Sequence, residues 1–222
     1  MILYDISMTI EPGMAVYKNR AEKRPRLTVT RDFAGSAVYE TRLEMDMHTG
    51  THIDMPLHIL PGGDSSDLWS VDHIFTRCTV LDFTDLESDR ITAENLEQKE
   101  FALQPGGSLF GPGQTVLLKT VNSQQESFDP AFIFLEKSGA AYLAEKQITG
   151  VGIDALGLER DQPGHETHRA LLEAGIWILE GLRLGDVPGG FYVLALMPLA
   201  IKGVEALPAR AVLLAPDSII LP

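Results

Sequence analysis

One short segment of this 222-residue chain holds most of the residue types that bind metals or transfer protons. It runs from His48 to His58 and contains three of the six histidines, together with Asp54. Two imidazoles and a carboxylate form the mixed nitrogen and oxygen ligand set that Zn²⁺ or Mn²⁺ favours. Three protein ligands also leave a coordination position for the water of a catalytic metal. We therefore predict a metal site formed by His48, His52 and Asp54.

The spacing of these ligands predicts an extended backbone with one bend. Side chains at positions 48, 52 and 54 share one side of a strand, because the strand period is two residues. A straight strand would place His48 and His52 about 13 Å apart, at the limit of what two imidazoles can span. Gly50 can supply the bend, since glycine adopts positive φ without steric cost. Pro56 then fixes the backbone before His58, which stays near the cluster without having to belong to it. A histidine-rich polar edge strand would explain neither the glycine nor the shared phase.

A second group of candidate ligands lies more than a hundred residues further along the chain. A helix is expected over residues 166–174, capped by Gly175, and a buried strand over 176–180 that ends in Glu180. A helix of about nine residues rises roughly 14 Å, and a strand of about five residues returns roughly 16 Å. Glu180 should therefore come back beside His168. The competing ligand is His165, three residues earlier on the same helical side, but the length match favours His168.

The remaining elements predict an α/β fold in a single domain over residues 1–222. Strands are expected at 3–7, 27–31, 37–47, 78–83, 115–120, 150–154, 176–180 and 191–197, and helices at 92–98, 129–146 and 166–174. Residues 27–31 and 37–47 form a hairpin that turns at 34–36. In its second arm the odd positions, such as Leu43, are apolar and predict the core face. His48, His52 and Asp54 then continue the even, polar face toward a cleft or a subunit boundary.

Composition limits the partners that this chain can have. The net charge of −13 argues against binding to nucleic acid or an anionic membrane surface, because the attraction to phosphate would have the wrong sign. Small molecules are the expected partners. The start of the chain lacks a signal-peptide pattern, and the longest apolar run, 191–201, is too short to span a bilayer. With Cys78 as the single cysteine, predicted to be a buried inert thiol, we infer a cytoplasmic protein.

Other catalytic motifs are incomplete in this sequence. Residues 106–110 lack the final glycine of a Gly-x-Ser-x-Gly elbow. The glycine-rich stretch 107–115 has no Gly-Lys-Ser/Thr, and we interpret it as a turn before a strand. Residues 150–152 lack the third glycine of a dinucleotide fingerprint and predict a tightly packed strand instead.

The metal segments resemble a known family along most of the chain. The pattern His48-x-Gly50-Thr51-His52-x-Asp54-x-Pro56-x-His58 resembles the signature of the metal-dependent cyclase family, which includes bacterial kynurenine formamidases (arylformamidases) and isatin hydrolases. Similarity extends from His168-x-x-Leu171-Leu172 to Glu180-Gly181-Leu182, and to Met197-Pro198-Leu199 with Pro208-Ala209-Arg210-Ala211. The resemblance implies a swivelling β/β/α domain that is active as a homodimer or homotetramer, with the site near a subunit boundary.

The resemblance also implies roles for individual residues. His48, His52 and Asp54 would hold one metal, and Asp54 and Glu180 would bridge to a second ion held with His168. His58 would transfer protons. The metal would be zinc, as one or two ions, with manganese as the alternative.

Near the substrate this chain departs from the family pattern. Where the formamidases carry a tryptophan, it has Val16-Tyr17-Lys18-Asn19, and residues 155–157 replace an expected serine-containing form. A basic stretch follows at 18–26. If this stretch binds substrate, Tyr17 would supply an aromatic surface and Lys18 would meet a carboxylate. If it does not, it is a solvated loop.

These residues predict a metal-dependent hydrolase of a small amide, similar to kynurenine formamidase. A metal lowers the pKa of bound water toward ~7 and polarises a carbonyl, and His58 can act as general base and then acid. Hydrolysis of an isatin-type lactam or a lactone, a metal-dependent dehydratase or cyclase, and a non-catalytic metal-binding scaffold remain alternatives. His58 argues against the scaffold, because pure metal binding has no use for a fourth imidazole placed after a rigid proline.

Overall fold

The chain folds around a closed barrel of β-strands. The computed structural model describes residues 1–217. Within them, seven strands pair in a ring, which β4 closes by pairing with β12. In order around the ring, the strands are β12 (Ala206–Leu214), β11 (Gly190–Pro198), β5 (Phe75–Asp82), β7 (Gln114–Lys119), β9 (Gly150–Ile153), β10 (Trp177–Glu180) and β4 (His52–Asp54). Strand β1 (Ile2–Asp5) pairs antiparallel with the C-terminal part of β12.

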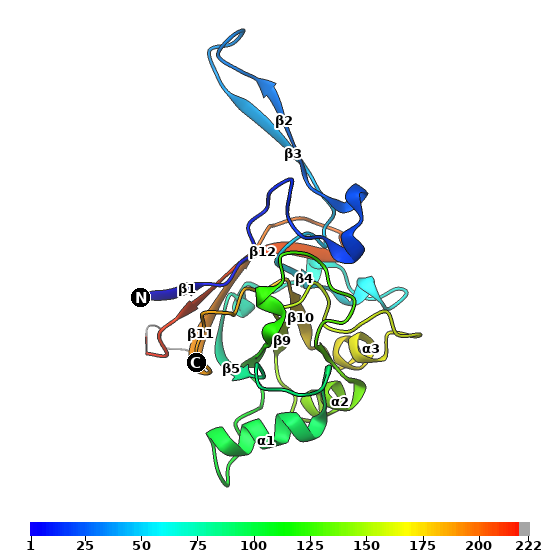
Figure 1. Cartoon of the computed structure of the whole chain (residues 1–222), viewed down its shortest axis with the longest axis vertical. Helices are drawn as coiled ribbons and strands as arrows, with labels where there is room; N and C mark the ends of the chain where they lie inside the picture. Colours follow the sequence, from blue (N-terminus) through cyan, green and yellow to red (C-terminus); the bar gives the residue numbers. More distant parts are fainter. Residues whose placement is uncertain (218–222) are drawn as a thin grey trace.

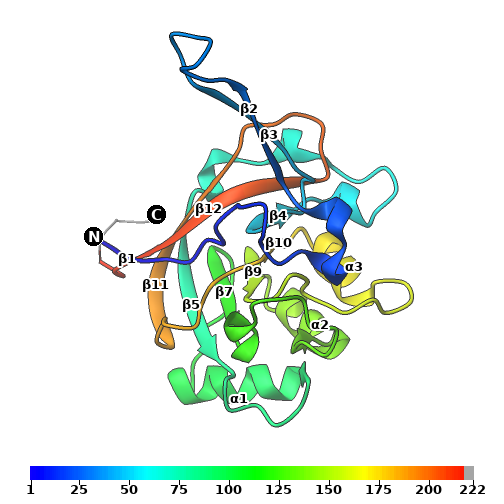
Figure 2. The ribbon, with the colours of Figure 1, turned by 45° about the horizontal axis from the view of Figure 1, so that its top comes forward.

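Three helices cover one side of this barrel (Figures 1 and 2). Strands β5, β7, β9 and β10 are parallel neighbours, and parallel neighbours need crossover connections. These connections carry α1 (Ala93–Leu103), α2 (Lys137–Glu145) and α3 (Glu166–Glu173). They also carry a short parallel pair, β6 (Arg90–Ile91) and β8 (Phe134–Leu135). The predicted alternation of strands and helices in an α/β fold is therefore confirmed.

Alternating side chains along the strands separate two apolar cores. Leu117 of β7 and Leu179 of β10 belong to the cluster inside the barrel. Val116 and Leu118 point the opposite way, because successive strand residues face opposite sides of a sheet. They pack with helix residues such as Leu171 in the second cluster. A polar side chain on this outer side of β4 or β10 therefore faces the helices.

Close packing around β9 confirms the interpretation of residues 150–152 as a tightly packed strand. A Cβ atom on Gly152 would lie 2.7 Å from the Leu117 side chain, and one on Gly150 would overlap the ring of Trp177. The thiol of Cys78 is 2% exposed inside the barrel, where burial raises its pKa. The prediction of a buried thiol is confirmed.

One predicted helix begins later than its sequence pattern indicates. The helix expected over 129–146 starts only at Lys137, because residues 134–135 pair as β8 and the Glu136 side chain accepts a hydrogen bond from the Ser138 N–H as the N-cap. Pro130 also disfavours helical backbone in the residue before it. The longest helix among residues 1–217, α1, has 11 residues, and none of the helices there is long and apolar enough to cross a bilayer.

The predicted hairpin is present, but its apolar face is not a core face. Strands β2 (Arg26–Arg31) and β3 (Glu40–Glu44) pair antiparallel and project away from the barrel (Figure 1). Leu43 is 47% exposed and its cross-strand partner Leu27 is 51% exposed. Alternation identifies which face is apolar, but it does not show that the same chain covers it. The assignment of the odd positions to the core of this chain is therefore wrong.

Candidate metal centre

The pairing of β4 with β10 brings together residues from the two predicted ligand segments. In the antiparallel register His52 lies opposite Glu180, and Asp54 lies opposite Ile178. Because Ile53 and Leu179 point into the barrel, His52, Asp54 and Glu180 point outward, toward the helices. Opposed side chains on one face of a sheet are about 5 Å apart at Cβ. This register places an imidazole and two carboxylates at one point on the barrel surface.

A turn before β4 brings His48 into the same cluster. Gly50 has φ of 65°, and the strand begins only at His52. The Nδ1 atom of His48 therefore lies 3.1 Å from Nε2 of His52. The predicted bend at Gly50 is confirmed. The turn also separates His48 from β3. The alternation had predicted that the cluster continues the polar face of the hairpin, and this prediction is wrong.

The backbones of Gly50 and Gly181 approach closely where this turn meets the end of β10. Gly181 has φ of 70°, and a Cβ atom there would overlap the carbonyl oxygen of Gly50. The Thr51 hydroxyl donates a 2.6 Å hydrogen bond to the carbonyl of Gly181 and accepts one of 2.8 Å from the N–H of Met8. The absence of side chains thus permits the close approach that sets the two ligand segments side by side.

Helix α3 supplies the next candidate ligand from its first turn. The Nε2 atom of His168 lies 3.2 Å from Glu180 Oε1 and 3.4 Å from Asp54 Oδ2. His165 begins the same helix, but its side chain is 43% exposed and its Nδ1 faces Glu159 at 3.3 Å. Of the two candidate histidines, the structure therefore brings His168 to the carboxylates.

Asp54 has the surroundings of a metal ligand. Its side chain is fully buried, yet neither carboxylate oxygen accepts a hydrogen bond from the residues that the structure describes. The ring nitrogens of His48 and His52 lie 3.0 and 3.4 Å from Oδ1 without hydrogen-bond geometry. Ligand atoms around a tetrahedral zinc are about 3.3 Å apart. A cation between these atoms would satisfy the buried carboxylate, so the residues fit a divalent metal.

Asp54 and Glu180 each lie between the histidines of the first segment and His168. Asp54 directs Oδ1 toward His48 and His52 and Oδ2 toward His168. Glu180 lies with Oε2 3.6 Å from His52 Nε2 and with Oε1 beside His168, where Oε1 also accepts a 2.5 Å hydrogen bond from the N–H of Leu158. This arrangement fits the expectation that both carboxylates bridge two ion positions.

Hydrogen bonds on the far side of two imidazoles orient them toward the cluster. His52 Nδ1 lies 2.9 Å from the carbonyl oxygen of Gly50, which can only accept, so this bond assigns the proton to Nδ1 and leaves Nε2 free to bind a metal. His168 Nδ1 lies 2.7 Å from Glu159 Oε1 and is oriented in the same way. Sequence reasoning missed Glu159. Ligating histidines commonly have such a carboxylate partner, but no spacing rule indicates which glutamate supplies it.

The electrostatics of the centre favour positive charge. Burial alone would raise the pKa of Asp54, but its contacts with His168, His48 and His52 hold that pKa well below the usual value. Burial would likewise lower the pKa of His52, but Asp54 and Glu180 outweigh it and raise the pKa to about 9. The pKa of His168 is raised against burial by Asp54, Glu159 and Glu180. Without a metal, the carboxylates thus favour the protonated forms of His52 and His168.

His58 lies at the open side of the cluster. It ends a short 3₁₀ turn, Pro56–His58, and its ring centroid is 4.2 Å from that of His48 and 5.9 Å from that of His168. Partial burial lowers the pKa of the His58 imidazole, while the charge of Asp54 acts in the opposite direction. A ring nitrogen of His58 also lies within 4.8 Å of ligand atoms of His48 and Asp54.

A cavity of about 260 Å³ opens over these residues. Tyr17 and Lys18 line it, so the structure brings the two predicted substrate-binding residues to the same cavity as the metal cluster. The other lining residues are Arg20, Lys23, His48, His58, Leu156, Gly157, Glu159, Arg160, Asp161, His165, His168 and Glu180. Residues 156 and 157, where the chain departs from the family pattern, are among them. The cavity is smaller than the roughly 300–1,000 Å³ of typical ligand sites.

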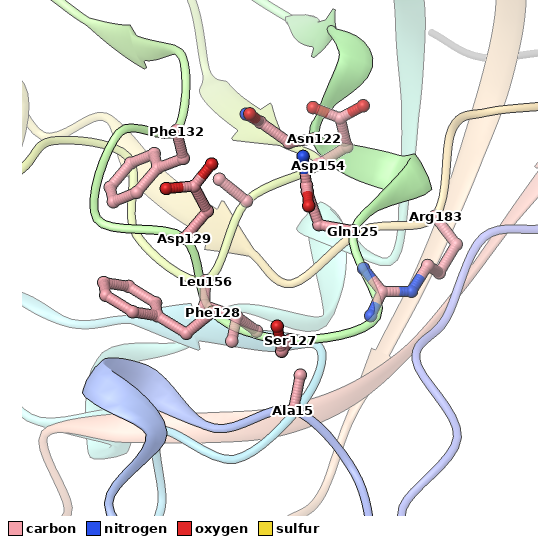
Figure 3. Close-up of a pocket in the computed structure, with 11 residues that line it drawn as sticks. Ala15, Asn122, Gln125, Ser127, Phe128, Asp129, Phe132, Asp154, Leu156 and Arg183 are labelled. Atoms are coloured by element: carbon pink, nitrogen blue, oxygen red, sulfur yellow. The ribbon is translucent and has the colours of Figure 1, made fainter.

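A second, smaller cavity shares Leu156 with the first (Figure 3). Asp154 lies in its wall beside Asn122. Its carboxylate accepts hydrogen bonds from the backbone and hydroxyl of Thr120 and from the hydroxyl of Ser123, at 2.7 to 2.9 Å. Burial outweighs these donors and raises the pKa of Asp154 to about 6.

The barrel, its helices and the buried histidine–carboxylate cluster define an α/β protein built to hold a divalent metal. The model of the Cyclase family, described as "Putative cyclase", matches residues 4–160, which include His48, His52, Asp54 and His58. The chain therefore belongs to the Cyclase family. The resemblance stated from the sequence motifs is confirmed.

Individual relatives agree with this assignment. The kynurenine formamidase of Salinibacter ruber is 33% identical over 98% of this chain and 100% of its own length. A solved structure titled as a predicted metal-dependent hydrolase from Bacillus stearothermophilus is 44% identical, covers 95% of this chain and 96% of its own, and has a TM-score of 0.80. Isatin hydrolase A from Labrenzia aggregata shares the fold, with a TM-score of 0.81 at 24% identity over 96% and 93% of the two chains.

Proposed function

We propose that this protein is a metal-dependent hydrolase of small amides with kynurenine formamidase-like activity. The observation that carries the proposal is Asp54, a fully buried carboxylate that accepts no hydrogen bond from residues 1–217 and lies at the point where three imidazoles converge. A carboxylate in that position needs a cation. The match to the Salinibacter ruber kynurenine formamidase, over 98% of this chain and the full length of that enzyme, supports the choice of reaction.

The proposed ligands are His48, His52 and Asp54 for one ion, and Asp54, Glu180 and His168 for a second. A bound ion would lower the pKa of water and polarise a carbonyl oxygen. Zinc suits the mixed nitrogen and oxygen donors best, and manganese is the alternative. The residues fit either one or two ions.

His58 is the proposed proton-transfer residue. Its ring lies at the mouth of the cluster, where a substrate would enter, and its lowered pKa leaves the imidazole neutral and able to accept a proton near pH 7. Amide cleavage then needs that proton on the departing nitrogen, because an amine leaves far more readily than its anion. A ring nitrogen of His58 would accept the proton from water and donate it to the leaving amine.

Tyr17 and Lys18 are the proposed substrate-binding residues. The Tyr17 ring packs edge-on against Phe128, with centroids 4.8 Å apart, and so presents a fixed aromatic surface to the cavity. A cyclic amide of the isatin type also carries an amide carbon–nitrogen bond next to an aromatic ring, which could pack on Tyr17. Lactam hydrolysis is therefore the second candidate reaction.

The proposal also includes the setting in which the enzyme works. We expect a cytoplasmic homodimer or homotetramer, because the chain has a single cysteine and the exposed apolar face of the hairpin needs a partner. Its expected partners are small-molecule substrates, with no nucleic acid or membrane among them.

Metal content and turnover measured together test the function. The purified protein should contain zinc or manganese by elemental analysis, hydrolyse N-formyl arylamines or isatins, and lose that activity to a chelator. His48→Ala should lose both metal and turnover. His165→Ala is the matched control for metal content, because it removes a neighbouring imidazole that faces Glu159 and not Asp54. Hydrolysis by a metal-free preparation would contradict the proposal.

A further inference from the structure

Four cationic side chains line the cavity above the metal centre of this strongly acidic protein. They are Lys18, Arg20, Lys23 and Arg160. With a net charge of −13 the protein as a whole repels anions. A substrate that carries a carboxylate would therefore need, at the cavity, a cationic side chain that is not already paired with a carboxylate of the protein.

Three of the four cations already have carboxylate partners. The Lys18 ammonium lies 2.7 Å from Asp161, and Lys23 lies 3.4 Å from Asp46. Arg160 lies 2.7 Å from Asp89. The guanidinium of Arg160 also donates to the backbone carbonyls of Ala131 and Phe132.

Arg20 differs from the other three. Its side chain is exposed, and it has neither an ion pair nor a side-chain hydrogen bond with any residue in the described range 1–217. The charge of Arg20 contributes to lowering the pKa of Asp161, but no side chain in the described range is hydrogen-bonded to its guanidinium, whose donors remain available to the cavity. Such a fork matches a carboxylate with two parallel hydrogen bonds.

The backbone that carries Arg20 is held in place. Lys18 and Asn19 both have positive φ, 56° and 52°, which is unfavourable for residues other than glycine. The Asn19 side chain compensates by clamping Phe128, donating to its carbonyl at 3.0 Å and accepting from its N–H at 3.2 Å. The segment is thus fixed over the cavity, while the guanidinium at its end remains free.

We propose that Arg20 is the specificity-determining residue that binds the carboxylate of an anionic aryl amide. The amide would lie at the metal centre, the ring against Tyr17 and the carboxylate at Arg20. This assignment rests on the proposed amide hydrolase function. It gives Arg20 the carboxylate contact expected of Lys18, and leaves Lys18 to anchor the segment through Asp161.

Paired substrates test the assignment. Arg20→Ala should raise KM for N-formylanthranilate by roughly 10- to 100-fold, the effect of losing a charge-assisted hydrogen bond. It should leave kcat and KM for neutral formanilide unchanged, and Arg20→Lys should restore part of the loss. Arg24→Ala is the control, because Arg24 is an exposed arginine that does not line the cavity. Equal effects on both substrates, or no effect on either, would overturn the proposal.

A binding measurement separates this proposal from the proposed function. If the wild-type protein hydrolyses neither substrate, the amide hydrolase function fails and the Arg20 assignment is judged by calorimetry alone. The metal-loaded wild type should then bind anthranilate more tightly than aniline, and Arg20→Ala should abolish that preference. A preference that survives in Arg20→Ala, or disappears in Lys18→Ala instead, would refute the role of Arg20.

Discussion

At the scale of single residues, Asp54 and His58 belong to one sequence segment but have different surroundings. Asp54 is fully buried and faces imidazoles on both sides, whereas His58 lies on the solvent side of the cluster. A side chain enclosed by other proposed ligands is expected to hold the metal and not to contact the substrate. One that lies open to an incoming molecule can exchange protons with it. The two residues should therefore fail in different ways when replaced.

Replacement of His58 tests that separation. His58→Ala should retain bound metal while kcat falls by roughly 10²–10⁴-fold, the usual contribution of a general acid–base residue. Elemental analysis and steady-state kinetics on one preparation measure both quantities. Metal loss in this variant would show that His58 is a ligand. Its ring lies close enough to His48 and Asp54 for all three to bind one ion.

The buried carboxyl of Asp154 gives a pH prediction away from the metal. Its pKa rises from 3.8 in the unfolded chain to about 6 in the folded one, so the folded state holds the proton more tightly. The resulting stabilisation is fully present below pH 3.8 and is lost as the pH rises through 6. Asp154→Asn cannot titrate. The free energy of unfolding of the wild type, relative to this variant, should fall by roughly 2–3 kcal/mol between pH 4 and pH 7.

Urea unfolding at several pH values measures this difference. Asp129→Asn, which alters another carboxyl of the same cavity, serves as the control. A constant difference between the wild type and Asp154→Asn across the pH range would mean that folding does not shift the pKa of Asp154.

At the scale of elements, the contact between Gly50 and Gly181 decides whether the two ligand segments meet. Gly181→Ala would force a Cβ atom onto the Gly50 carbonyl and should cost more than 2 kcal/mol of stability, together with bound metal. Gly203→Ala is the matched control. Its φ of 76° resembles that of Gly181, but nothing lies within 4 Å of the added atom, so only about 1 kcal/mol should be lost. Thermal unfolding and metal content compare the two, and equal losses would contradict the steric argument.

The sequence predicted those parts of the site that depend on local geometry. The shared phase of His52 and Asp54 follows from the strand period, and the bend from Gly50. The return of Glu180 to His168 follows from the lengths of α3 and β10. Each inference needs only rises and turns within a few residues.

Other parts depend on pairings that no local pattern encodes. The register of Glu180 opposite His52 joins distant segments, as does the bond from Thr51 to Gly181, which are 130 positions apart. Glu159 reaches His168 through a loop whose path has no periodicity. The face of the hairpin was misassigned for a related reason, since a pattern does not say which molecule covers it.

At the scale of the whole molecule, the projecting hairpin predicts association. Leu27, Val29 and Leu43 share one face and are 47 to 51% exposed, and an isolated two-stranded hairpin is marginally stable in water. We expect a second copy of the chain to cover this face. Sedimentation should show a dimer or tetramer for the wild type and a monomer for Leu27→Asp combined with Leu43→Asp. Thr28→Asp, on the opposite face, should leave the assembly intact, and a monomeric wild type would contradict the expectation.

Strand β4 has a consequence for when the protein can acquire its metal. It is three residues long, carries His52 and Asp54, and is held between β10 and β12. Its ladders form only after long stretches of chain have closed into loops, which places them late in folding. During synthesis, β4 leaves the ribosome long before either of its neighbours. The His48–His58 segment therefore emerges before His168 and Glu180, and we expect the complete set of proposed ligands to form only once β10 and β12 have paired with β4.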